Sequence, residues 1–184
     1  VDQAMQPAYS PDGKTIAFRA FAGGHADIYL LDVASGAVTN LTNDEAYDAD
    51  PVFTPDGKAL VFSSQSGESA KLFRLELDNP AQRTQLTFGP GNDEGTSFSR
   101  DGKRLYFASD RDQGVMDIYS LDLESRDLER LTRVIGSALN PVAIPTRDGE
   151  RVVFQAYAKG RYALYLADPA QAVSAGKEEL AQPS

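Results

Sequence analysis

The chain has 184 residues, of which 41% are hydrophobic and 24% charged, a composition typical of a globular domain with a substantial core. Eighteen basic residues against twenty-seven acidic ones give a net charge of −9, which argues against a nucleic-acid partner because phosphate binding needs clustered Lys and Arg. The absence of cysteine excludes disulfide scaffolds, thiolate metal sites and cysteine nucleophiles. No run approaches the ~20 apolar residues of a membrane helix, so we expect no transmembrane segment.

A short turn sequence recurs four times along the chain. The copies occupy residues 10–13, 54–57, 99–102 and 146–149, and their glycines lie 44, 45 and 47 residues apart. In the pattern Ser/Thr-Pro-Asp-Gly, proline pre-sets φ, aspartate bonds nearby backbone N–H groups, and glycine leaves the turn without steric cost. We therefore interpret Asp12, Asp56, Asp101 and Asp148 as turn-forming residues.

Each turn is followed by aromatic landmarks at nearly constant spacing. A phenylalanine lies five residues after each glycine, and a second aromatic residue follows 11 or 12 residues later. The phenylalanines are Phe18, Phe62, Phe107 and Phe154, and the second aromatics are Tyr29, Phe73, Tyr119 and Tyr165. The flanking segments are short apolar runs without helical periodicity, which indicates strands. The landmark aromatic residues are expected to form the core between blades.

Four short antiparallel strands in about 45 residues are typical of a β-propeller blade. The sequence thus predicts an all-β propeller with four blades of four antiparallel strands each, at residues 7–42, 51–87, 96–132 and 141–181. The four blades could be part of a longer propeller, a self-closed four-bladed ring, or half of an eight-bladed ring made by two chains. An unclosed arc would expose apolar faces on the two end blades, and we then expect self-association. The residues expected on these faces are Ile16, Phe18, Ile28 and Tyr29 in the first blade and Val153, Phe154, Leu164 and Tyr165 in the last.

The sequence offers little for catalysis. The only histidine, His25, lies in a glycine-rich loop, and no Gly-x-Ser-x-Gly elbow is present, so a serine triad is not expected. No glycine loop has the spacing of a phosphate cradle. The chain is predicted not to be an independent enzyme and to need no organic cofactor.

Acidic residues gather before the second and third blades. Asp48 and Asp93 share one repeat position, and Glu45, Asp50 and Glu94 lie in the same two loops. Loops that lead into innermost strands ring one mouth of a propeller channel, so Glu45, Asp48, Asp93 and Glu94 form a candidate metal site. Carboxylate oxygens suit Ca²⁺, and a basic peptide is the alternative ligand. These acids could equally be solvated loop residues without a ligand.

The repeat Pro-x-[Phe/Tyr]-[Ser/Thr]-Pro-Asp-Gly, continued by Asp-Ile-Tyr and Leu-Thr, resembles the TolB-like β-propeller repeat over residues 7 to about 168. The resemblance implies a non-catalytic protein–protein interaction module of the bacterial cell envelope, periplasmic or otherwise extracytoplasmic. It also implies protein partners such as the envelope lipoprotein of the Tol–Pal system. No partner-contacting motif can be matched residue by residue.

The chain departs from the TolB pattern in lacking the N-terminal α/β domain and in showing four repeats where six are usual. The same repeat occurs in the propellers of prolyl-oligopeptidase-like serine peptidases. The alternative is therefore a substrate-gating propeller whose catalytic domain lies outside this chain.

Overall fold

The computed structural model describes residues 2–158 and 160–178, and these residues are almost entirely β-structure. The only helical element among them is a single 3₁₀ turn at Pro169–Gln171. No described segment forms a helix with the length and apolarity that a membrane span requires. The chain divides into two compact units, Val1–Leu86 and Thr87–Ser184.

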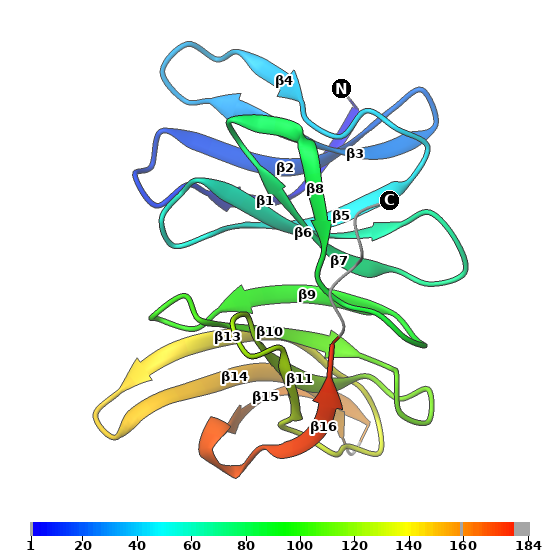
Figure 1. The fold of residues 1–184 in the computed structure, drawn as a ribbon, viewed down its shortest axis with the longest axis vertical. Helices are drawn as coiled ribbons and strands as arrows, with labels where there is room; N and C mark the ends of the chain where they lie inside the picture. Colours follow the sequence, from blue (N-terminus) through cyan, green and yellow to red (C-terminus); the bar gives the residue numbers. More distant parts are fainter. Residues whose placement is uncertain (1, 159, 179–184) are drawn as a thin grey trace. The chain divides into compact units, whose positions relative to one another are not determined.

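The first unit contains two blades of four antiparallel strands (Figure 1). Its first blade consists of β1 (Asp2–Tyr9), β2 (Thr15–Ala22), β3 (His25–Asp32) and β4 (Val38–Asn40). Its second blade consists of β5 (Tyr47–Phe53), β6 (Ala59–Gln65), β7 (Lys71–Glu76) and β8 (Asn79–Gln85). One parallel bridge between Ala26 and Tyr47 joins the two blades.

The second unit contains the third and fourth blades. The third consists of β9 (Asp93–Phe98), β10 (Arg104–Ser109), β11 (Asp117–Asp122) and β12 (Asp127–Arg130), with β16 (Val173–Lys177) as a fifth strand. The fourth consists of β13 (Ala138–Thr146), β14 (Gly149–Ala158) and β15 (Arg161–Ala167). The propeller prediction is confirmed, with a different strand count in these two blades.

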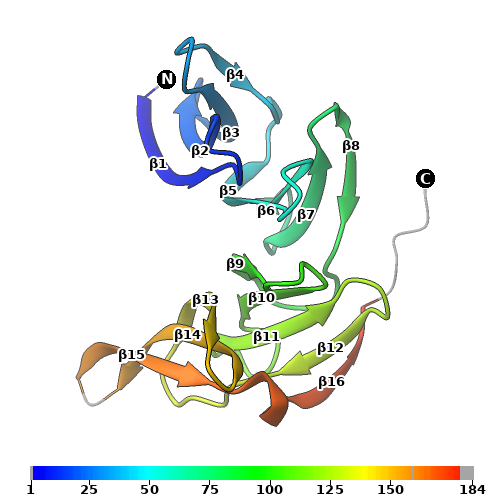
Figure 2. The ribbon, with the colours of Figure 1, turned by 90° about the vertical axis from the view of Figure 1, so that its left-hand side faces the viewer.

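The last described strand within the predicted bounds of the fourth blade, β16, belongs to the third blade instead. Figure 2 shows β16 beside β12, and the two strands pair antiparallel from Asp127↔Lys177 to Arg130↔Val173. The edge of β12 offers unpaired backbone groups, which an additional strand satisfies, and the ion pair of Lys177 with Asp127 at 3.2 Å supports the register. Residues 179–181 of the prediction lie outside the described residues. In the described structure the fourth blade has three strands.

Most of the aromatic landmarks form the core as predicted, whereas Tyr165 of the fourth blade is 41% exposed. Each blade pairs its phenylalanine with the second aromatic residue across the two central strands, as Phe107↔Tyr119 does in the third blade. The ring centroids of the four pairs lie between 5.7 and 6.3 Å apart. All four phenylalanines are buried, from Phe107 at 0% exposure to Phe18 at 8%.

The recurring turn is built the same way in three of the four blades. In the third blade Ser99 Oγ donates to Asp101 Oδ1 at 2.7 Å, and the backbone N–H of Lys103 donates to the same oxygen at 3.1 Å. The first two blades repeat these bonds at Asp12 and Asp56. The fourth turn differs from the prediction, because Thr146 pairs with Gly149 in a two-residue hairpin and Asp148 accepts no hydrogen bond from a described residue.

Each innermost strand carries a bulge at one repeat position, directly before the residue that is proline in three of the blades. The bulge residues have left-handed φ values of 54° at Gln6, 53° at Asp50, 60° at Gly95 and 52° at Asn140. Bulges bend a strand and re-aim its neighbouring side chains. Because of the bulge, the part of each strand that contains Asp48 or Asp93 pairs with the next strand in a register shifted from that of the residues after the bulge.

The fourth blade has one apolar face without a covering layer within its unit. Leu164 is 75% exposed, Leu166 65% and Tyr162 54%. The expectation that Phe154 shares this face is wrong, since Phe154 is buried against the third blade with Tyr106 and Ile118. In the first blade Ile28 packs against the second blade, and Phe18 and Tyr29 are buried, so these three do not form the expected open face either. Successive side chains of a strand point to opposite faces, so adjacent residues could not all face outward.

Candidate functional site

The strand register confirms that Asp48 and Asp93 hold one repeat position. Asp48 lies opposite Ser64 across β5 and β6, and Asp93 lies opposite Ser109 across β9 and β10. In each blade the opposing serine is two residues after the landmark phenylalanine. Both aspartates have 0% exposure, so they are buried strand residues rather than solvated loop acids.

Asp93 is neutralised by an arginine. Arg111 Nη2 donates to both oxygens of Asp93, at 2.9 and 3.1 Å, and Arg111 Nη1 donates to Glu178 Oε1 at 2.5 Å. Burial lowers the pKa of Arg111, but the charges of Asp93 and Glu178 outweigh burial and raise it. The guanidinium also lies over the rings of Phe107 and Tyr119, 5.5 and 5.4 Å from their centroids. Such buried pairs persist only when every charge is compensated.

Asp48 has no such partner. Neither of its carboxylate oxygens accepts a hydrogen bond from any described residue, although both oxygens are buried. Burial raises the pKa of Asp48, and the nearby hydroxyls of Ser64 and Thr42 lower it less. Counted from the landmark phenylalanine, the residue that corresponds to Arg111 is Ser66. The second blade therefore buries the carboxylate without the cation that the third blade supplies.

Asp27 shows the same difference between blades. It corresponds to Asp117, whose oxygens accept hydrogen bonds from Arg130 Nη2 and, at 2.7 Å, from the Thr132 hydroxyl. Asp27, 4% exposed, accepts a hydrogen bond at 2.9 Å from the neutral amide of Asn40, which replaces Arg130 in the repeat. The two third-strand aspartates are thus held alike, but only Asp117 is paired with a positive charge.

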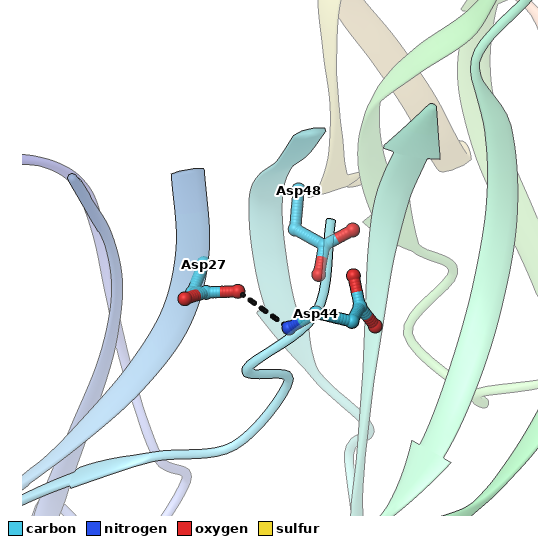
Figure 3. Close-up of side chains that lie close together, drawn as sticks. All are labelled: Asp27, Asp44 and Asp48. Carbon is cyan, nitrogen blue, oxygen red and sulfur yellow. Dashed lines mark hydrogen bonds between the residues drawn. The ribbon is translucent and has the colours of Figure 1, made fainter. Parts of the chain in front are cut away.

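Asp44 brings a third carboxylate to this place, between β4 and β5. Its backbone N–H donates to Asp27 Oδ1 at 3.4 Å, as drawn in Figure 3. Its side chain is 38% exposed and forms an ion pair with Arg83, which also donates to the carbonyl of Thr42 at 2.7 Å. Carboxylate oxygens of Asp27, Asp44 and Asp48 all lie within 4.8 Å of one another.

A pocket of about 420 Å³ opens beside Asp44 and is also lined by Glu45, Ser64, Ser66 and Arg83. Of the three carboxylates, that of Asp44 lines the pocket, and it is the most exposed of the three. The arrangement is suited to binding a cation through oxygen, and it offers no nucleophile with an adjacent base.

The residues singled out from the sequence lie in both units. Glu45 is exposed and lies next to Asp44, and Glu94 is partly buried in β9. A shared site of Glu45, Asp48, Asp93 and Glu94 stays a prediction. The sequence interpretation did not include Asp27 and Asp44 in the site. A signal for Asp27 was present, because aligning the repeats on Leu-Thr shows that Asn40 takes the place of Arg130, the partner of the corresponding Asp117.

Comparison with known proteins gives the family. The model of the TolB beta propeller domain matches residues 2–179 of the chain. The chain belongs to this family. Its TolB-like repeat is therefore established over nearly the whole sequence.

Individual relatives agree with this assignment. The TolB-like chain is 37% identical over 123 residues to the Tol-Pal system protein TolB of Bordetella pertussis, a match that covers 67% of this chain and 28% of the relative. The crystal structure of TolB from Acinetobacter baumannii superposes with a TM-score of 0.78 at 26% identity, covering 95% of this chain and 44% of the other. The chain thus spans less than half the length of either TolB.

A puromycin hydrolase shares the fold. Its crystal structure superposes with a TM-score of 0.73 over 99% of this TolB-like chain and 30% of the hydrolase, at 18% identity. At that identity the likeness concerns the fold alone.

Proposed function

We propose that the chain is a non-catalytic TolB-like propeller domain that binds protein partners in the bacterial cell envelope, outside the cytoplasm. The observation that carries this proposal is the family match over residues 2–179, together with 37% identity to a Tol-Pal system protein. The relatives are longer than this chain, so the activity of the whole protein is part of the proposal.

The chemistry of the described residues supports a binding role. The buried ionisable groups of the second unit form closed structural networks, such as Asp93 with Arg111 and Asp117 with Arg130. His25, the only histidine, is exposed at the first residue of β3, and its side chain forms no hydrogen bond with a described residue. Rigid blades that present loops are typical of interaction scaffolds, because loops tolerate variation while the sheets hold them in place.

The partner that we propose is an envelope lipoprotein of the peptidoglycan-associated type. The support is the name of the Bordetella pertussis relative, which places that protein in the Tol-Pal system. The competing function is a gating propeller for a serine peptidase domain, which the fold shared with a puromycin hydrolase makes reasonable.

Calorimetric titration separates the two functions. The purified chain is titrated with the soluble domain of the peptidoglycan-associated lipoprotein encoded in the same genome, and the protein expressed from the complete gene is assayed for release of an aminoacyl arylamide. We expect saturable lipoprotein binding and no hydrolysis. Hydrolysis by the complete protein, together with no lipoprotein binding, would overturn the proposal.

A further inference from the structure

We propose that Asp27, Asp44 and Asp48 form a binding site for a divalent cation that prefers oxygen ligands, with Ca²⁺ as the best fit. Asp27 lies near the start of β3 in the first blade, Asp44 lies in the connection to the second blade, and Asp48 lies in β5, the innermost strand of the second blade (Figure 3). The site lies wholly within the first unit.

The unpartnered carboxylate of Asp48 is the observation that calls for a ligand. Both of its oxygens are buried and accept no hydrogen bond from the described residues, and Figure 3 shows them turned toward the other two carboxylates. A buried ionised carboxylate without a partner is costly, and native proteins normally pair such groups or let them coordinate a metal. Since no described residue compensates the Asp48 carboxylate, a bound cation is the partner that would do so.

The charge balance indicates a divalent ion. Arg83 is the only Lys or Arg among the described residues that forms an ion pair with any of the three carboxylates. Three carboxylates and one guanidinium leave two negative charges, which a divalent cation compensates. A proton on Asp48 would leave Asp27, 4% exposed, without a counter-charge.

The separations suit calcium. Ca²⁺ binds oxygens at about 2.3–2.6 Å, so two ligands on opposite sides of one ion lie about 5 Å apart. The three carboxylates offer oxygens within 4.8 Å of one another, which lets one ion contact all three. Mg²⁺ holds its ligands at about 2.0–2.1 Å with near-octahedral geometry, which this spread suits less well. Water from the pocket beside Asp44 can fill the remaining coordination positions.

The third blade provides an internal comparison. At the repeat positions of Asp48 and Asp27 it carries Asp93 and Asp117, and it supplies Arg111 and Arg130 to them. The first unit has Ser66 and Asn40 in place of these arginines. The same buried carboxylates are thus compensated by guanidinium groups in one unit and, in our proposal, by a metal ion in the other.

The test titrates the chelator-treated chain with CaCl₂ by calorimetry and measures its thermal midpoint with and without calcium. We expect about one equivalent of calcium to bind and the midpoint to rise. Asp48→Asn and Asp44→Asn should weaken binding at least tenfold, and Asp44, being partly exposed, is the variant less at risk of misfolding. Asn40→Arg should weaken binding similarly, since it gives Asp27 the partner that Asp117 already has.

Asp148→Asn is the matched control, because it removes one exposed carboxylate from the second unit and should bind calcium like the unaltered chain. The absence of calcium heat and of a midpoint shift at millimolar calcium would overturn the proposal. Equal calcium responses in Asp48→Asn, Asp44→Asn and Asp148→Asn would overturn it too, because calcium would then bind elsewhere.

Discussion

Arg111 donates to both oxygens of Asp93, at 2.9 and 3.1 Å, and so compensates a carboxylate with no exposure to solvent. Asp48 has the same place in the preceding blade and the same burial, but no arginine. The repeat thus preserves the position of the acid while the compensating charge changes from blade to blade. This difference accounts for the cation site that we propose and leads to a direct test of the Arg111 network.

Replacing Arg111 by methionine should destabilise the chain by about 3–5 kcal/mol, because the buried carboxylates of Asp93 and Glu178 would both lose the guanidinium that binds them. Urea unfolding at neutral pH measures the loss. In the double variant with Asp93→Asn, one of the two buried acids that lost Arg111 is no longer charged, so part of the stability should return. An Arg111→Met chain as stable as the original would contradict the role assigned to this network.

Phe107→Ala should cost about 3–5 kcal/mol, as for other large core truncations. Phe107 is fully buried and stacks on Tyr119 at a centroid distance of 6.1 Å. The control is Tyr9→Ala, since Tyr9 is 68% exposed and its removal should change the free energy of unfolding little. Similar losses in the two variants would argue against the blade core described above.

The turn aspartates should make stability depend on pH in the acid range. Hydrogen bonds from the Ser99 hydroxyl and the Lys103 backbone N–H lower the pKa of Asp101 below the ordinary value of an aspartate. A group with a lowered folded-state pKa stabilises the fold above the unfolded-state pKa and loses that contribution as pH falls through the folded-state value. Asp101→Asn should therefore be less stable than the original chain at pH 7, and the difference should shrink as the pH falls through the lowered folded-state pKa of Asp101.

Urea midpoints at a series of pH values test this expectation. Asp148→Asn is the control, because the Asp148 carboxylate accepts no hydrogen bond from a described residue, and the substitution should change stability little. A stability difference for Asp101→Asn that stays constant from neutral to strongly acidic pH would rule out this role for the turn.

The open face of the fourth blade should cause self-association of the isolated chain. Leu164 and Leu166 are 75% and 65% exposed on one sheet face, and apolar patches of this kind commonly mark contact surfaces. Light scattering at increasing protein concentration should show a second copy bound, and Leu164→Lys/Leu166→Lys should reduce the association. A monomer at all concentrations would show that this face needs no cover.

The fold could be predicted from the sequence because its repeat is local. The turn sequence and the position of Phe62 or Phe107 within each blade follow from turn chemistry and strand periodicity, which neighbouring residues decide. The position of β16 could not be predicted this way. The strand could pair with the outer edge of the third blade or with that of the fourth, and the observed pairing of Leu128 with Gly176 joins residues far apart in the sequence.

The candidate site was only partly predictable for a similar reason. The repeat register identified Asp48, but Asp27 belongs to a different strand of another blade and reaches Asp48 only through the packing of two blades. Asp44 joins them from the connection after Leu-Thr, at a position where the third blade has Val134 and therefore no carboxylate. The sequence does show that Asn40 and Ser66 stand where the third blade has Arg130 and Arg111. These differences indicate uncompensated carboxylates only once the structure shows that the neighbouring aspartates are buried.

The most direct test of the cation site is anomalous diffraction from crystals of the chain grown with Mn²⁺, which takes the same oxygen ligands as calcium and scatters anomalously. The account predicts one strong anomalous peak within coordination distance of Asp27, Asp44 and Asp48. A map without a peak there, with the Asp48 carboxylate unchanged and unliganded, would contradict it.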